Sequence, residues 1–110
     1  MQALAPAIED EIYQTALVTD EATLPTENNT GRGVIVYRWQ YDAGTGGEVT
    51  ASFRDFYFAL NRINKILDNI DAVPVKDAAE DAAKKQIKGE SLALRAYCHF
   101  ELLRSFSAGF

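Results

Sequence analysis

Apolar residues recur with a seven-residue period through the middle of the chain, from Thr50 to Asp71. One series is Phe53, Leu60 and Leu67, the other is Phe56, Ile63 and Ile70, and Tyr57, Asn64 and Ile66 widen the same side. Two such series predict a helix with one buried stripe, as in helix-on-helix packing. Thr50 or Ser52 can cap the start of this helix, and Pro74 ends it.

A second long helix is expected from Asp77 to about Ser107, roughly 45 Å at 1.5 Å per residue. Asp77 and Glu80 have the spacing of a capping box, with Asp in place of the usual Ser or Thr. The short connection between two long helices predicts an antiparallel hairpin. Gly89 costs about 1 kcal/mol against Ala inside a helix, so we expect a neighbouring backbone to approach closely there.

This last helix carries apolar residues on two sides. One side holds Ile87, Leu94 and Cys98, and the other holds Gly89, Leu92, Ala93, Ala96, Phe100, Leu103 and Phe106. A helix with two apolar sides packs between two neighbours, as in a stack of helical repeats. Because the chain supplies only about one and a half hairpins, we expect one side to lack a partner and the 110 residues to be part of something longer.

The N-terminal part predicts a shorter helix, Ala5–Thr19, with Pro6 in its first turn. Its expected apolar stripe is Ile8, Ile12, Tyr13, Ala16 and Leu17. After the turn-forming residues 26–33, the β-branched and aromatic segment Val34–Tyr41 alternates in character, which predicts a short strand or extended arm. A flexible loop is expected at residues 42–48. Together these elements predict an all-α fold with one extended arm.

Composition excludes several function classes. The net charge is −5 and the basic residues are scattered, so nucleic-acid binding is not expected. Cys98 is the only cysteine, which excludes an intramolecular disulfide and favours a buried apolar role. No segment is apolar enough to span a membrane, and Met1–Pro6 lacks the basic start and apolar run of a signal peptide.

The charged residues of the last helix do not form a catalytic set. Arg95 and His99 are four residues apart and share a face, whereas Glu90 lies about 140° from Arg95 around the helix. We interpret them as buried charges that pair with other helices, in preference to a site. His99 is the only histidine and has no second ligand at metal spacing. We therefore expect neither enzymatic activity, nor a metal, nor a cofactor.

Two segments, "FYFALNRINKILDNID" and "IKGESLALRAYCHFELLRSF", resemble the N-terminal region of SusD/RagB-like proteins. The first segment matches the family pattern at Tyr57, Leu60, Ile63, Asn64, Ile66 and Leu67. The second matches it at Gly89, Glu90, Leu94, Arg95, Ala96, Phe100, Leu103 and Phe106. Ser91 stands where the family usually has Ala. The resemblance covers most of the chain and is strongest over Phe53–Phe106.

The resemblance implies tetratricopeptide-like (TPR-like) helical hairpins and a non-enzymatic surface lipoprotein of Bacteroidetes-type bacteria. Such proteins capture oligosaccharides and deliver them to a SusC-like TonB-dependent transporter in the outer membrane. Family members are several hundred residues long and carry a lipid-bearing N-terminal cysteine. We therefore expect residues 1–110 to be the N-terminal helical part of a SusD-like domain, with membrane attachment only through an anchor that this chain lacks.

The best candidates for carbohydrate contact are Trp39, Tyr37 and Tyr41, because aromatic faces pack against the apolar C–H faces of sugar rings. Arg38, Arg32 and Asp20 could supply hydrogen bonds to hydroxyl groups nearby. The alternative is that these aromatic residues simply cover the helical hairpin.

A second function also stays open from the sequence. The chain could be a free-standing TPR-like adaptor that binds a peptide or a partner helix in a groove. If the chain is a fragment, its uncovered apolar side should also promote self-association.

Overall fold

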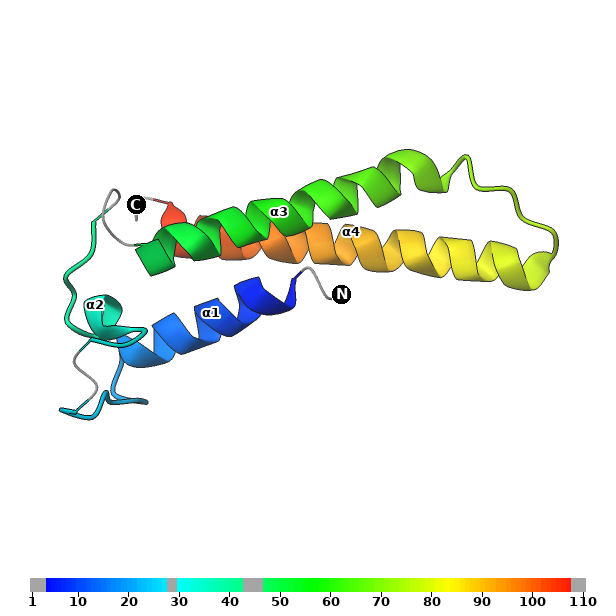
Figure 1. The fold of residues 1–110 in the computed structure, drawn as a ribbon. Coiled ribbons are helices and arrows are strands. Elements are labelled where there is room, and N and C mark those ends of the chain that lie inside the picture. Colours follow the sequence, from blue (N-terminus) through cyan, green and yellow to red (C-terminus); the bar gives the residue numbers. More distant parts are fainter. Residues whose placement is uncertain (1–3, 28–29, 43–46, 108–110) are drawn as a thin grey trace. The chain divides into compact units, whose positions relative to one another are not determined.

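The computed structural model describes residues 4–27, 30–42 and 47–107 of the chain. Within these ranges it contains four helices and no strand: α1 (Ala5–Leu17), α2 (Val34–Tyr37), α3 (Gly47–Ile70) and α4 (Ala78–Phe106) (Figure 1). The expected all-α fold is confirmed. The chain divides into two compact units, Met1–Phe56 and Tyr57–Phe110, with the boundary inside α3.

In the first unit, α1 begins one residue before Pro6, as expected, and the predicted stripe is confirmed at Leu17 but not at Ile12. Ala7 and Leu17 are buried, whereas Ile12 is 66% exposed. The buried side includes Gln14, whose Nε2 donates to Ser52 Oγ at 2.7 Å and to the Glu48 carbonyl at 3.2 Å. A hydrogen-bonded amide can face α3 at small cost, so the side of α1 that packs inward is not purely apolar.

The predicted extended arm at Val34–Tyr41 is wrong, because its first four residues form the one-turn helix α2. Val36 is buried at 2% exposure, while Ile35 and Tyr37 on either side of it are exposed. A single helical turn therefore buries one β-branched side chain. The strand preference of this segment is outweighed by its contacts with the rest of the unit.

The start of α3 also differs from the prediction. The helix begins at Gly47, so neither Thr50 nor Ser52 is its cap. Ser52 is buried, and its hydroxyl donates back to the Glu48 carbonyl at 3.3 Å while accepting from Gln14. Of the loop expected at residues 42–48, residues 43–46 lie outside the described part.

The second unit is an antiparallel hairpin, in which the later part of α3 is joined to α4 by the connection at residues 71–77 (Figure 1). The predicted stripe of α3 is confirmed at its centre, since Phe56, Leu60, Ile63 and Ile70 are buried. It is narrower than predicted, because Phe53, Tyr57, Asn64 and Ile66 are exposed.

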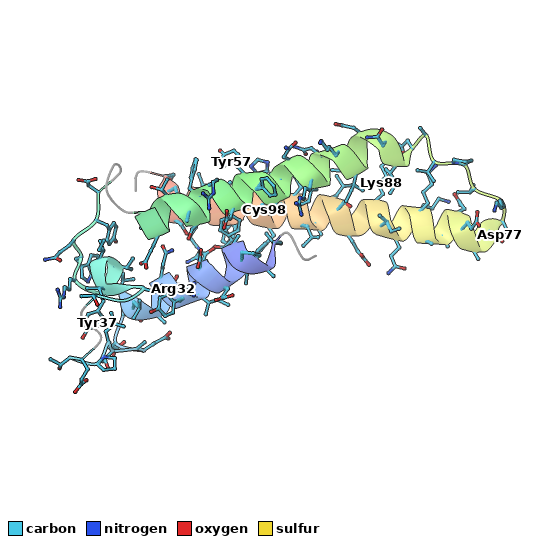
Figure 2. All side chains as sticks on the ribbon, viewed as in Figure 1. Arg32, Tyr37, Tyr57, Asp77, Lys88 and Cys98 are labelled. Carbon is cyan, nitrogen blue, oxygen red and sulfur yellow. The ribbon has the colours of Figure 1, made fainter. Side chains whose placement is uncertain are left out.

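The connection is held by polar contacts to the first turns of α4. Asp77 is the N-cap, as predicted, and its Oδ1 accepts from the Glu80 N–H at 2.8 Å. Lys84 Nζ donates to the Asp71 carbonyl at 2.9 Å and to the Val73 carbonyl at 2.8 Å. Lys88 pairs with the Asp71 carboxylate at 2.7 Å and lowers the pKa of that carboxyl (Figure 2).

The two apolar sides of α4 have different environments. Cys98 and Leu102 are buried together with Ser91 and Glu101, which places one sparse stripe inside. The other predicted side is exposed, as at Leu92, Phe100 and Leu103. The close approach expected at Gly89 is wrong, because a Cβ placed there would have no atom of a neighbouring element within 4 Å.

Candidate functional site

Gly33 determines how α2 packs against α1 and the start of α3. Gly33 is the N-cap of α2, with φ of +86°. Its N–H donates to Glu48 Oε1 at 2.7 Å. A Cβ at this position would lie 2.5 Å from Leu17 Cδ1 and 2.7 Å from the Tyr13 hydroxyl oxygen. Both the positive φ and the close approach require glycine here.

Arg32, directly before this glycine, ties the segment to α1. Its guanidinium pairs with Glu9 at 3.1 Å and with Asp10, and it lies over the Tyr13 ring at 4.7 Å. The hydrogen bond that Arg32 donates to Glu9 contributes most to raising the pKa of Arg32. In return, the Tyr13 hydroxyl donates to the Arg32 carbonyl at 3.0 Å. The guanidinium that we considered for ligand hydroxyls is thus engaged by two carboxylates.

The C-terminal end of α2 adopts the hydrogen-bond pattern of a Schellman motif. The Gln40 N–H donates to the Ile35 carbonyl at 2.9 Å, and the Trp39 N–H donates to the Val36 carbonyl at 3.1 Å. In this motif the residue after the C-cap is left-handed and is usually glycine. Here that residue is Trp39, with φ of +55°, the one non-glycine residue of the described chain with positive φ.

The unusual backbone presents an aromatic pair to solvent. The rings of Trp39 and Tyr41 are stacked, with centroids 6.5 Å apart and planes at 25°. Trp39 is 67% exposed and Tyr41 is 37% exposed. A side chain in the left-handed region costs about 1–2 kcal/mol, and an indole so exposed recovers little of this through burial. Strain of this kind is typical of functional positions.

The other sequence candidates lie in the same unit without contacting this pair. Tyr37 is 36% exposed on α2 (Figure 2), and Arg38 is its C-cap. Asp20 lies in the turn that follows α1. Among the described residues, no hydrogen bond or ring contact joins Tyr37, Arg38 or Asp20 to the two stacked rings. The structure therefore brings Trp39 and Tyr41 together and leaves the other three side chains exposed.

Sequence reasoning missed the residues that position this surface. Glu48 accepts from Gly33 through one carboxylate oxygen, and its other oxygen is buried without a partner in the described part of the chain. The sequence signal for Gly33 was its place immediately before a β-branched run, where a glycine can begin a turn as well as end a loop. No local signal pointed to Glu48, because its partner lies fifteen residues away.

The charged residues of α4 do not form a site. Glu90 is exposed and accepts from Gln86 at 2.8 Å, and His99 is exposed as well, so the expectation that these two are buried is wrong. The buried charge is Glu101, which pairs with Arg104 at 2.6 Å. Within the described ranges, no three His, Cys, Asp or Glu side chains cluster closely enough to hold a metal ion.

Comparison with known proteins identifies a family. The model of the SusD-like family described as "Starch-binding associating with outer membrane" matches residues 3–110. No curated protein and no solved structure matches the chain. Among the described helices, none has the length and apolar character needed to cross a membrane.

Proposed function

Because the chain belongs to the SusD-like family of starch-binding proteins that associate with the outer membrane, we propose that it binds an oligosaccharide on an exposed aromatic surface. This aromatic surface consists of Tyr37, Trp39 and Tyr41. The family match indicates starch or glycan binding in general. The proposal adds which side chains of this chain contact the sugar.

The stacked rings suit a sugar chain. Sugar rings have apolar C–H faces that pack on aromatic rings, and such contacts give a large area at low entropic cost. Two rings with centroids 6.5 Å apart offer adjacent platforms. Arg38 and Asp20 have no partner among the described residues and could donate to and accept from hydroxyl groups of the same ligand.

The observation that carries the proposal is the left-handed Trp39. Glycine would complete the Schellman motif without strain, so stability alone does not account for tryptophan at this position. The strain is accounted for if the exposed indole is needed for binding.

The remaining parts of the proposal follow from the family. We infer a non-enzymatic protein that captures oligosaccharides at the cell surface and passes them to a SusC-like TonB-dependent transporter. We also propose that residues 1–110 form the N-terminal helical part of a SusD-like domain, held at the outer membrane by a lipid anchor. Co-purification of the transporter with the full-length lipoprotein from outer membranes tests this partner.

Binding is tested by titrating the chain with maltoheptaose, an α-1,4-linked glucose oligomer, and measuring heat and amide chemical shifts. We expect shifts around Trp39 and Tyr41, and a loss of affinity of about tenfold or more in Trp39→Ala, in line with removal of an aromatic anchor. Phe100→Ala removes an aromatic ring of α4 that is also more than half exposed, and should leave the affinity unchanged. Equal affinity of the Trp39→Ala variant and the native chain would contradict the assignment.

A second candidate function is favoured by the exposed apolar side of α4. Leu92, Phe100 and Leu103 are all exposed and share one side of the helix, which suits a partner helix or a second copy of the chain. The oligomeric state measured by light scattering across a concentration series tests self-association. Replacement of Phe100 and Leu103 by Gln should abolish any dimer, whereas a monomer at every concentration excludes it.

A further inference from the structure

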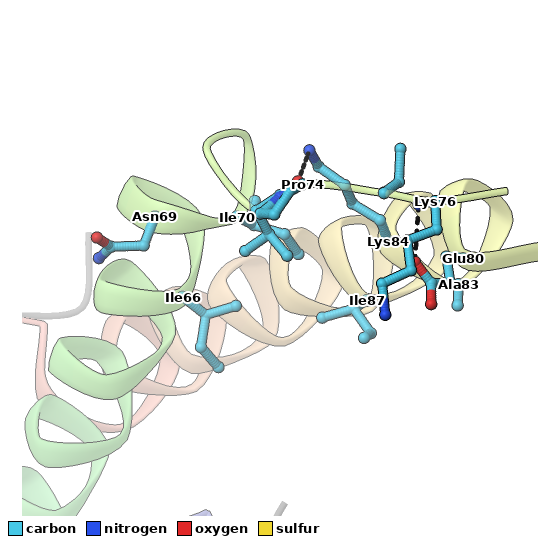
Figure 3. Close-up of a pocket in the computed structure, with 11 residues that line it drawn as sticks. Ile66, Asn69, Ile70, Pro74, Lys76, Glu80, Ala83, Lys84 and Ile87 are labelled. Carbon is cyan, nitrogen blue, oxygen red and sulfur yellow. Dashed lines mark hydrogen bonds between the residues drawn. The ribbon is translucent and has the colours of Figure 1, made fainter.

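A groove of about 630 Å³ opens where α3 ends and α4 begins, entirely within the second unit (Figure 3). This volume lies in the range of small-molecule sites. Its large aliphatic side chains are Ile66, Ile70, Val73, Val75 and Ile87, and Pro74 and Ala83 complete the apolar lining. Ile70 is buried at its base, and the other four large aliphatic side chains are about half exposed, so a good deal of apolar surface remains for an occupant to cover.

Nearly all polar groups that line the groove are already engaged. Lys84 donates to two carbonyl groups of the connection, and the Asn69 amide donates to a carbonyl one turn earlier in α3 at 2.7 Å. Glu80 Oε2 accepts from the backbone N–H of Lys76 at 2.8 Å. These hydrogen bonds hold the wall of the groove together.

The ammonium group of Lys76 is the exception. It makes no hydrogen bond or ion pair with any described residue. Figure 3 shows the Lys76 side chain extending along the groove in the direction of Ile87. The groove thus combines an apolar wall with two ammonium groups, Lys76 and Lys84, and one carboxylate, Glu80, which gives its lining a net charge of +1.

We propose that this groove binds a single-chain amphiphilic anion, meaning a linear apolar chain that ends in one carboxylate. The apolar chain would cover Ile66, Val73 and Ile87, and the carboxylate would pair with Lys76. A charge-assisted hydrogen bond to an ammonium group is stronger than a neutral one. This ligand class is different from the oligosaccharide of the proposed function, and the two sites lie in different units of the chain.

The observations favour this ligand over a peptide and over an anionic membrane surface. A peptide brings backbone N–H and C=O groups that need partners, whereas Asn69, Glu80 and Lys84 already make hydrogen bonds within the chain. An anionic membrane surface is attracted by clusters of basic residues, whereas this groove has one unpaired lysine in a chain of net charge −5. A soluble amphiphile with one charge matches both the wall and the lysine.

The test is a titration of the 110-residue chain with decanoate, octanoate and neutral 1-octanol, each below its aggregation limit, followed by amide chemical shifts. We expect shifts confined to residues around Val73, Lys76 and Ile87, and decanoate binding about four- to tenfold more tightly than octanoate. Octanoate should in turn bind more tightly than 1-octanol, which lacks the charge.

Variants separate the contribution of the Lys76 charge from that of the apolar lining. Lys76→Gln should weaken octanoate about three- to tenfold and bring it to the affinity of 1-octanol. Lys65→Gln removes an exposed lysine of α3 outside the groove and should change nothing. Ile87→Ser alters a half-exposed side chain, so the hairpin should stay folded while decanoate affinity falls.

Three results would overturn the proposal. The first is absence of localised shifts with decanoate, and the second is equal weakening by Lys76→Gln and Lys65→Gln. The third is binding only to vesicles of an anionic phospholipid, which would assign the groove to a membrane surface. Loss of maltoheptaose binding has no bearing on these measurements, so failure of either proposal is recognised separately.

Discussion

Replacement of Trp39 by Gly and by Ala tests the left-handed backbone on which the proposed binding surface rests. Both variants lose the indole, so they differ only in the presence of a Cβ. At φ of +55° the Cβ costs about 1–2 kcal/mol, and the greater flexibility of unfolded glycine offsets about 0.5–1 kcal/mol of this. Trp39→Gly should therefore be more stable than Trp39→Ala by roughly 0.5–1 kcal/mol, the difference between these two terms.

Thermal unfolding followed by circular dichroism measures this difference. One kcal/mol corresponds to about 4–8 °C in Tm for a domain of this size class, so the Gly variant should melt several degrees higher. The same pair at Thr15, an exposed position inside α1, is the control, and there Ala should be more stable by about 1 kcal/mol. If Ala is also the more stable residue at position 39, Trp39 is not left-handed and the strain argument fails.

Four further predictions concern stability and reactivity. Gly33→Ala should destabilise the chain by about 2–4 kcal/mol, from the positive φ and the overlap with Tyr13 and Leu17, and urea unfolding that shows no loss would contradict this. Asp77→Ala should lower stability by about 1 kcal/mol, since it removes the N-cap of α4; unchanged Tm would exclude the cap. Burial raises the pKa of Cys98, so the thiol should react with a disulfide reagent at pH 8 only after unfolding, and rapid reaction of the folded chain would refute its burial. Lys88 lowers the pKa of Asp71 below its ordinary value of 3.8, so the stabilisation should be present above that value and disappear as pH falls; a Tm difference from Asp71→Asn that persists in acid would contradict the pairing.

The two long helices were the most predictable part of the fold. The stripe of α3 repeats over several turns, so Phe56, Leu60, Ile63 and Ile70 could be assigned to the interior from spacing alone. Asp77 was recognisable as a cap because its partner is only three residues away. A repeating apolar stripe and a cap between residues three apart can both be recognised directly in the sequence.

The sequence predicted which aromatic residues form the candidate site, but not the backbone conformation that carries them. Tyr37, Trp39 and Tyr41 were identified as aromatic candidates, and all three are exposed. The extended arm that was expected to carry them was wrong, because the segment folds as one helical turn with a Schellman end.

What the sequence by itself determined is the helical class, the approximate position of the two hairpin helices, the Asp77 cap of α4, and the family. Tertiary structure decided the conformation of α2, since a four-residue segment has too few internal hydrogen bonds to select a helix over a strand. Contacts from Gly33 to Glu48, Leu17 and Tyr13 make that selection. They also determine that Trp39 carries the strain of a left-handed residue and holds its ring in solvent.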